Sequence, residues 1–268
     1  MPDIRNDKRE TFRGLLGEGK NLCFVFDFDG TLAPIVDDPL EARVSEFLIE
    51  PLRALAARTQ IKVVSGRPVD FLIERLRDVF LPTAVDLEIF GKYGIESGTL
   101  AKGVTRVFAT PSEALSQLHA LEDAMRPLMP EGCFIEEKGT STGYHFRQNP
   151  SQQQNIHDLL LGNIRGLQLE LLELHGGKMV FEAMVKGVPT KRSVVLGFQN
   201  DFEGIFFAGD DLGDVDALNS VSELPDGRGF TVLVRGSVEA EEKVGSFVDL
   251  IVEDQVQLAD LIIELIDL

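Results

Sequence analysis

Short apolar segments alternate with longer amphipathic ones in the first hundred residues. The stretch 22–28 is apolar up to its acidic end, which predicts a buried strand in a sheet that is covered on both faces. Apolar residues at helical spacing follow over 44–58, and the alternation repeats as a strand at 61–64, a helix at 71–79 and a strand at 87–90. This rhythm predicts right-handed βαβ units and a doubly wound α/β core with a parallel sheet.

The pattern changes near residue 108. A helix is predicted over 111–129, and strand-like segments then follow at 133–138, 142–147, 167–174 and 179–185, with one more helix among them at 151–164. Glycine-containing turns separate these strands as in β-hairpins, so we expect a small α/β insert with an antiparallel sheet.

Beyond residue 187 the strand–helix rhythm returns. It predicts a helix at 191–196, strands at 204–208 and 230–234, and a closing amphipathic helix at 258–266. We therefore expect a core domain made of residues 1–107 and 187–268, which a second domain at 108–186 interrupts.

Charge and composition narrow the classes of partner. The 268 residues carry 26 basic and 44 acidic side chains, a net charge of −18, which disfavours nucleic acid because its backbone attracts a basic surface. No apolar run approaches the roughly 20 residues of a membrane helix, so no membrane partner is expected. The charged N-terminal segment contains no apolar signal core, which favours a cytoplasmic location.

Acidic side chains follow two of the buried strands. Asp27 and Asp29 come at the end of the strand at 22–28. A second group, Asp210, Asp211 and Asp214, follows the strand at 204–208. Ligands bind at the carboxyl ends of strands in open parallel sheets, and so many carboxylates would not all stay ionised without a cation. A single acid at a strand end is usually a turn or helix cap, but two such groups indicate a Mg²⁺ site.

Two further residues are candidates for binding phosphate. Ser65 follows the strand at 61–64 at a turn into a helix, where a hydroxyl and backbone N–H groups can hold a phosphate. Lys191 opens a predicted helix and can supply the positive charge that the acidic chain otherwise lacks. Each alone is ordinary, a helix cap and a surface lysine, so both depend on the acidic groups for their interpretation.

Together these residues resemble the four motifs of the haloacid dehalogenase (HAD) superfamily, in the order of that family. Phe26–Leu32 is similar to its DxDxT signature, Val64–Arg67 to the second motif, Lys191 to the third and Gly209–Asp214 to the fourth. The resemblance implies a Rossmann-like core with an inserted α/β cap domain.

The likeness narrows to the trehalose-6-phosphate phosphatases over about residues 22–220. It is carried by the segments at 27–38, 65–67, 136–139, 144–147, 175–182 and 208–216. The resemblance implies a Mg²⁺-dependent phosphoric monoester hydrolase of trehalose biosynthesis, which converts trehalose 6-phosphate to trehalose and phosphate.

Roles for the acids follow from that resemblance. Asp27 is expected to attack phosphorus and form an aspartyl phosphate, and Asp29 to protonate the leaving sugar hydroxyl and then deprotonate water. Mg²⁺ is expected to be held by the Asp27 carboxylate, the Asp29 backbone carbonyl and Asp210.

The same resemblance assigns the residues around the phosphoryl group. Ser65 and Lys191 are expected to bind its oxygens, where charge must be offset. Asp211 and Asp214 are expected to reach the metal through water or to orient Lys191. Arg67 either binds substrate or only caps its loop.

In the cap, Glu136, Lys138 and Glu182 resemble the family's sugar-binding residues, since carboxylates and an ammonium group suit dense sugar hydroxyls. The alternative is that they are solvated ends of hairpin strands. His145 is interpreted as a hydrogen-bonded structural histidine and is not placed among the catalytic residues.

The sequence departs from the family at its third motif. The lysine lies one residue later than usual and Arg192 replaces a glycine, so Lys186 and Arg192 compete with Lys191. The segment Thr59–Ser65 is also shorter than usual. These departures leave room for a pseudotrehalose phosphate, sucrose 6-phosphate or a mannosyl phosphoglycerate as substrate.

A protein of a different class, a non-catalytic sugar-phosphate sensor, is a remote alternative. The sequence pattern gives no sign of the oligomeric state.

Overall fold

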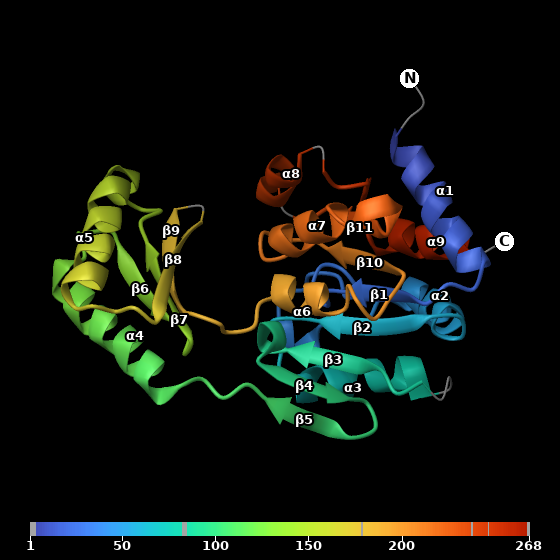
Figure 1. The fold of residues 1–268 in the computed structure, drawn as a ribbon, viewed down its shortest axis with the longest axis horizontal. Coiled ribbons are helices and arrows are strands. Elements are labelled where there is room, and N and C mark those ends of the chain that lie inside the picture. The colour runs from blue at the N-terminus through green and yellow to red at the C-terminus, as the bar shows by residue number, and fades with distance from the viewer. Residues whose placement is uncertain (1–3, 82–84, 178, 237, 246, 267–268) are drawn as a thin grey trace. The chain divides into compact units, whose positions relative to one another are not determined.

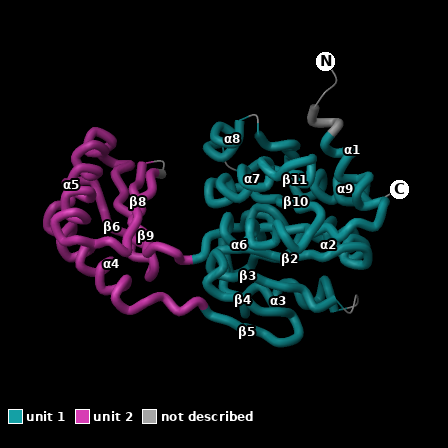
Figure 2. The backbone as a smooth tube through the Cα atoms, in the orientation of Figure 1, with its two compact units in different colours: residues 1–107, 189–268 teal, residues 108–188 magenta. Residues whose placement is uncertain are grey.

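The computed structural model describes residues 4–81, 85–177, 179–236, 238–245 and 247–266 (Figure 1). The chain divides into two compact units (Figure 2). We call them the core unit, Met1–Val107 with Pro189–Leu268, and the inserted unit, Phe108–Val188. In the part of the chain that is described, no helix is both long and apolar enough to cross a membrane.

The core unit is built on an eight-stranded sheet with the order β12-β11-β10-β1-β2-β3-β4-β5. Its strands are β1 (Leu22–Phe26), β2 (Gln60–Val64), β3 (Glu88–Gly91), β4 (Glu96–Thr99), β5 (Gly103–Val107), β10 (Gly204–Gly209), β11 (Gly229–Val234) and β12 (Leu250–Val252). Pairing from β12 to β3 is parallel, whereas β4 and β5 pair antiparallel at one edge. The sequence predicted the parallel part but not this edge hairpin.

Helices cover both faces of the core sheet (Figure 1). One face carries α1 (Ile4–Gly17), α2 (Glu46–Ala56), α3 (Val69–Phe80) and α9 (Gln255–Ile266). The other carries α6 (Lys191–Gly197), α7 (Val215–Ser222) and α8 (Val238–Val244). Because strand side chains alternate, Phe24 and Phe26 pack on the first face and Cys23 and Val25 on the second, so β1 has no polar position. The predicted doubly wound α/β fold is confirmed.

Short 3₁₀ helices occupy several of the connections. They are η1 (Pro39–Glu41), η3 (Lys92–Gly94) and η6 (Pro225–Gly227) in the core unit, and η4 (Arg126–Leu128) and η5 (Pro150–Gln152) in the inserted unit. η3 matters below because it follows β3, whose carboxyl end lies beside that of β2.

The inserted unit has a four-stranded antiparallel sheet with the order β6-β7-β9-β8. Its elements are α4 (Ser112–Met125), β6 (Phe134–Glu137), β7 (Ser141–His145), α5 (Gln153–Gly166), β8 (Leu172–Gly177) and β9 (Val180–Val185). Tyr144, Phe181 and Ala183 are buried on the face where α4 and α5 lie (Figure 1). The opposite face carries several polar side chains, among them Glu136, His145 and Glu182, in agreement with a half-buried sheet.

One predicted strand was wrong in part. The segment 167–174 was expected to be extended, but α5 continues to Gly166 and a turn follows, so that β8 begins only at Leu172. Gln168 has a left-handed backbone (φ 54°), and Leu169 is buried beneath the turn. Leu169 therefore anchors a helix–strand connection, whereas Leu167 is 48% exposed. The turn between β8 and β9 includes residue 178, which lies outside the described residues.

An aromatic cluster holds α1 on the sheet. The ring of Phe12 lies 5.7 Å from that of Phe24 and 5.8 Å from that of Phe230, and Phe24 stacks on Phe206 at 4.8 Å. All four side chains are buried. The sequence indicated no role for the first 20 residues, but Phe12 makes α1 a part of the core.

Replacing Phe12 with alanine should therefore lower the free energy of unfolding of the core unit by about 3–5 kcal/mol, because it removes a buried ring and leaves a cavity. Urea denaturation followed by circular dichroism measures the change. Phe47→Ala is the matched control: Phe47 is 55% exposed on α2, so its loss should cost less than about 0.5 kcal/mol. Equal effects of the two substitutions would contradict this view of α1.

Candidate active site

Three neighbouring strands of the core sheet end at the same edge. Phe26, the last residue of β1, is paired with Ala208 of β10 on one side and with Val63 of β2 on the other. The next residue, Asp27, donates its backbone N–H to the Ala208 carbonyl oxygen at 2.9 Å. The chain passes from β1 to β2 on one side and returns to β10 on the other, which creates the crevice where α/β sheets bind ligands.

A buried lysine lies between two carboxylates at this edge. Lys191 is the first residue of α6, whose start is fixed by Thr190: the Thr190 side chain accepts from the Ser193 backbone, and the Ser193 hydroxyl accepts from the Thr190 N–H. Lys191 Nζ lies 2.9 Å from Asp27 Oδ2 and 2.7 Å from Asp214 Oδ1, and all three side chains are buried. The capped helix end thus delivers one positive charge to the end of β1.

The structure distinguishes the three candidates for the lysine motif. Lys186 donates to the Glu170 carbonyl oxygen at 2.6 Å within the inserted unit, and Arg192 Nε donates to Ser220 Oγ at 2.8 Å. Among these three, Lys191 is the residue that contacts Asp27. The irregular spacing of the motif therefore does not move the positive charge away from the strand ends.

Asp214 holds the loop after β10 in place as well as the lysine. Its Oδ2 accepts from the backbone N–H groups of Asp210 and Asp211, at 3.2 and 3.3 Å. Gly209 makes this approach possible, because a Cβ there would lie 2.4 Å from Asp214 Cγ. Asp211 is exposed, and its Oδ1 accepts from the Gly213 N–H at 2.8 Å.

Asp210 and the loop after β1 also approach closely. Gly30 has a left-handed backbone (φ 73°), and a Cβ there would lie 2.0 Å from Asp210 Oδ2. A glycine is required at this position because any side chain would collide with the carboxylate and be strained by the backbone.

Burial and crowding disturb the ionisation of these groups. Burial, with some help from Asp210, raises the pKa of Asp27 to about 6 even though Lys191 opposes the shift. Burial, with the charges of Asp214 and Asp211, raises the pKa of Asp210 to about 7. Burial acts to lower the pKa of Lys191, but the charges of Asp214 and Asp27 outweigh it and raise that pKa. The site therefore contains more negative charge than its own cation neutralises.

The buried acids fit a hard divalent cation. Carboxylate oxygens of Asp27, Asp210 and Asp214 lie within 4.8 Å of one another. Asp214 is already engaged by Lys191 and two N–H groups, whereas no hydrogen bond among the described residues engages the Asp210 carboxylate. Asp27 and Asp210 are thus the side chains best able to hold Mg²⁺, which accepts few carboxylates and keeps other positions for water or phosphate oxygens.

The Arg67 side chain was expected either to bind substrate or to cap its own loop, and in the structure it contacts Asp29. Its Nε and Nη2 donate to the two Asp29 oxygens at 2.7 and 2.8 Å, a bidentate pair. The guanidinium also lies over the ring of Phe71, 4.7 Å from its centroid. Both oxygens of the Asp29 side chain are therefore engaged by Arg67. The predicted contribution of Asp29 to the metal, which is its backbone carbonyl, stays a prediction.

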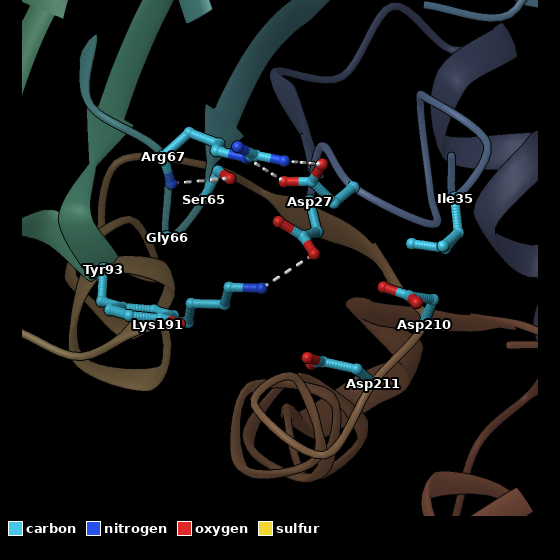
Figure 3. A pocket seen from close by; sticks show the side chains of 10 residues that line it. Asp27, Ile35, Ser65, Gly66, Arg67, Tyr93, Lys191, Asp210 and Asp211 are labelled. Carbon is cyan, nitrogen blue, oxygen red and sulfur yellow. Dashed lines mark hydrogen bonds and ion pairs between the residues drawn. The ribbon is translucent and has the colours of Figure 1, made fainter. Parts of the chain in front are cut away.

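Ser65 is buried at the end of β2, and its Oγ accepts from the Arg67 backbone N–H at 3.2 Å. It lines the same cavity as Asp27, Lys191 and Asp210 (Figure 3). This cavity has a volume of about 290 Å³ and lies wholly within the core unit. Its full lining is Asp27, Asp29, Ile35, Ser65, Gly66, Arg67, Tyr93, Lys191, Asp210 and Asp211.

Two residues of this lining were missed by the sequence reasoning. Ile35 and Tyr93 are apolar or aromatic and exposed, in a cavity whose other side chains are polar. The signal for Tyr93 was present in the glycines on either side, Gly91 and Gly94, directly after a predicted strand.

The predicted sugar-binding residues lie together in the inserted unit. Glu136 and Glu182 both face Gly143 of the central strand β7, and Lys138 Nζ lies 3.6 Å from Glu136 and 3.4 Å from Glu182. His145 Nε2 lies 2.9 Å from Glu136 Oε2, so the histidine is part of this group. Gly143 makes room for it, because a Cβ there would lie 2.9 Å from His145 Nε2.

The charges in this group depend on one another. A hydrogen bond from His145 lowers the pKa of Glu136, with a smaller effect of Lys138. Partial burial opposes the charge of Lys138, but Glu182 and Glu136 raise its pKa. The result is a row of mutually paired polar groups on the exposed face of the sheet. The side chains of Glu136, Lys138 and Glu182 are still 50%, 41% and 30% exposed, so their predicted role in binding sugar stays a prediction.

A parallel, doubly wound sheet with acids at two strand ends, a buried lysine and an inserted α/β unit is the architecture of HAD-type phosphatases. The sequence matches the trehalose-phosphatase family over residues 25–250. The chain belongs to this family, a family of phosphoric monoester hydrolases.

Individual relatives agree with that assignment. A probable trehalose-phosphate phosphatase I of Arabidopsis thaliana is 28% identical over 236 residues, which are 81% of this chain and 61% of the relative. A trehalose 6-phosphate phosphatase of Zea mays, RA3, is 25% identical over 81% of this chain and 63% of its own length. The chain thus spans about three fifths of these two relatives. The trehalose-6-phosphate phosphatase structure from Aspergillus fumigatus has the same fold, with a TM-score of 0.73, 21% identity and 97% of each chain covered.

The raised pKa values make stability depend on pH and on Mg²⁺. Because folding raises the pKa of Asp27 to about 6 and of Asp210 to about 7, the folded chain holds protons that the unfolded chain releases. Stability from these groups therefore falls as the pH rises from about 4 through about 7. We expect Mg²⁺ to raise the melting temperature by about 2–4 °C at pH 8, and to have little effect at pH 5.

The variant that tests this prediction is Asp210→Asn, which removes one buried carboxylate. Without metal at pH 8 it should melt above the wild type, and it should lose the response to Mg²⁺. Asp201→Asn, at an exposed acid outside the cavity, should keep the wild-type response in the same thermal scan. An unchanged Mg²⁺ response in Asp210→Asn would rule out Asp210 as a metal residue.

Proposed function

We propose that the chain is a Mg²⁺-dependent phosphatase that hydrolyses trehalose 6-phosphate to trehalose and phosphate through an aspartyl-phosphate intermediate. The observation that carries the proposal is the buried Lys191 between Asp27 and Asp214, beside Asp210 and at the ends of two adjacent strands. Membership of the trehalose-phosphatase family supports the choice of substrate.

In the proposed reaction, an Asp27 oxygen attacks phosphorus and the bond between phosphorus and the sugar oxygen breaks. Asp29 gives its proton to the departing oxygen, so trehalose leaves as a neutral alcohol. Asp29 then takes a proton from water, the water oxygen attacks phosphorus, and the bond to Asp27 breaks to release phosphate. Lys191 and the Ser65 hydroxyl neutralise and orient the phosphoryl oxygens.

Mg²⁺ would be held by Asp27 and Asp210, with the Asp29 carbonyl as a third ligand, and would supply positive charge next to the transferred group. The cavity needs that charge: it is lined by four carboxylates and two cations, a balance that repels a phosphate dianion. Asp214 keeps Lys191 in place, and Asp211 is too exposed to do more than act through water.

Arg67 sets a condition on the acid step. As a bidentate partner it donates to both Asp29 oxygens, so each of them already accepts a hydrogen bond. At least one Asp29 oxygen must therefore be released by the guanidinium before it can pass a proton to the leaving oxygen. We propose that the arriving phosphate group takes over these Arg67 donors, which agrees with the assignment of Arg67 to substrate binding.

The inserted unit is proposed to act as the cap domain that recognises the sugar. Glu136, Lys138 and Glu182 form one group of acceptors and donors on an exposed sheet face. Ser141 donates to Glu182 at 2.7 Å and orients one acceptor, while His145 orients another. Prearranged groups of this kind suit the hydroxyls of a disaccharide.

The function is tested with Mg²⁺ and a panel of phosphate esters: trehalose 6-phosphate, sucrose 6-phosphate, a mannosyl phosphoglycerate and a pseudotrehalose phosphate. We expect kcat/KM to be highest for trehalose 6-phosphate. A higher kcat/KM for another member of the panel would identify that sugar phosphate as the substrate. The proposed aspartyl-phosphate mechanism would be unaffected. Tight binding of the sugar phosphates without turnover would favour a sensor instead.

The mechanism is tested on Asp27→Asn, which keeps the shape of the nucleophile and removes its charge. Activity should fall by about ten-thousand-fold, because no aspartyl phosphate can form. Rapid quenching and mass spectrometry should detect a phosphorylated Asp27 in the wild type and none in the variant. Asp37→Asn, at an exposed acid outside the cavity, is the control and should be fully active. Substantial phosphate release by Asp27→Asn would exclude the mechanism.

The role of the inserted unit is tested on Glu182→Gln. Loss of one charged acceptor should raise KM for trehalose 6-phosphate about tenfold and leave the hydrolysis of acetyl phosphate, which has no sugar, unchanged. Glu131→Gln, at an exposed acid elsewhere in the inserted unit, should alter neither. A parallel loss on both substrates would show that Glu182 acts on folding and not on sugar binding.

A further inference from the structure

The turn that carries Tyr93 has an unfavourable backbone. Lys92 (φ 48°) and Tyr93 (φ 61°) are both left-handed, and Gly94 follows at φ 104°. Left-handed residues other than glycine are uncommon, and an aromatic one is rare because its Cβ crowds the backbone. Such a turn persists only where the surrounding structure determines it, and strain of this kind gathers at functional sites.

The surroundings of the turn do determine it. The Tyr93 N–H donates to the Ser65 carbonyl oxygen and the Lys92 N–H to that of Arg67, both at 2.9 Å. On the other side Gly94 lies against α6, where a Cβ would come within 2.4 Å of the Val194 side chain. The turn is thus held between the Ser65–Arg67 loop and the helix that begins with Lys191.

This arrangement places the Tyr93 ring at the cavity. The ring lies on Gly66, where a Cβ would be 2.8 Å from the ring Cζ, and its centroid lies 6.0 Å from Lys191 Nζ. Yet the residue is 52% exposed, so the ring is not there to fill the core. Figure 3 shows it beside Lys191 at one side of the cavity.

Ile35 lies on the opposite side. In Figure 3 the side chains of Asp27 and Lys191 are between Tyr93 and Ile35. Ile35 follows the tight loop after β1, in which Ala33 bridges to Asp29 and donates its N–H to the Phe28 carbonyl oxygen at 2.8 Å. Ile35 is 70% exposed, so its side chain is free to contact a ligand in the cavity that it lines.

We infer that Tyr93 and Ile35 form an apolar slot that grips the ring of the sugar bearing the phosphate, on the assumption of the function proposed above. A pyranose ring presents C–H groups on its faces and hydroxyls around its edge, so its faces suit an aromatic and an aliphatic side chain. The slot holds the leaving oxygen in line with Asp27 while the charged groups bind the phosphate. Both residues are substrate-positioning residues and take no proton.

The slot makes a prediction about substrate class. Esters whose phosphate lies one carbon from a ring, as in glucose 6-phosphate and trehalose 6-phosphate, should benefit from it. Acetyl phosphate reaches the same charged groups but has no ring, so it reports on the chemistry alone.

The experiment measures kcat and KM for trehalose 6-phosphate, glucose 6-phosphate and acetyl phosphate with Mg²⁺. Tyr93→Asn removes the ring and keeps a residue that tolerates the left-handed backbone. It should lower kcat/KM for both sugar phosphates by about 10- to 100-fold, the scale of a lost apolar contact in a pocket, and leave acetyl phosphate within about twofold. Tyr93→Phe, which keeps the ring, should retain wild-type activity on all three.

Ile35→Ala is the second variant, on an ordinary backbone, and should also lose activity on the sugar phosphates alone. Phe47→Ala, which removes an exposed ring outside the cavity, is the control and should change nothing. Equal losses on acetyl phosphate and the sugars, or wild-type activity of either deletion variant on the sugars, would overturn the slot. A wild type that hydrolyses acetyl phosphate but no sugar phosphate would overturn the proposed function and the slot together.

Discussion

A single buried positive charge organises the catalytic end of the core sheet. Lys191 lies within 3 Å of Asp27 and Asp214, and the three are enclosed where water cannot neutralise them. Removal of the lysine would leave two buried carboxylates uncompensated, which is among the costliest changes that a protein interior can undergo. Asp214 in turn accepts from the backbone after β10, so the same ion pair fixes the loop that carries Asp210. The positions of Asp27, the proposed nucleophile, and of Asp210, the predicted metal residue, thus depend on the contacts of one lysine.

The lysine does not balance the site. Asp27 and Asp210 keep raised pKa values in its presence, because burial and the neighbouring acids outweigh it. This residual negative charge suits the divalent cation of the proposed reaction, in a chain whose overall charge repels phosphate. Arg67 pairs in a similar way with Asp29, donating to both of its oxygens. Asp27 and Asp29, the proposed nucleophile and acid, thus each have a cationic partner, and the acidic charge that remains unpaired is that of Asp210 and its neighbours.

Glycines and strained turns complete the site by allowing close approach. Gly30 and Gly209 let the acids of β10 come against the backbone, and Gly66 makes room for the Tyr93 ring. In the inserted unit Gly143 makes room in the same way for the His145 ring. Each is a position where a methyl group would displace a functional side chain, so the backbone of this protein is shaped by its site as much as by its core.

The sequence by itself determined the doubly wound core and the residues that follow its strands, because apolar periodicity reports burial and strand ends meet at one edge of a parallel sheet. It also indicated Asp27, Asp29, Ser65, Lys191 and Asp210 by their place after strands or at a helix start. Only the tertiary structure decided between Lys191 and its neighbours, joined Arg67 to Asp29, made α1 part of the core and brought Tyr93 and Ile35 to the cavity. These are contacts between segments far apart in the chain or between a turn and its surroundings, and local pattern holds no record of which distant side chains will meet.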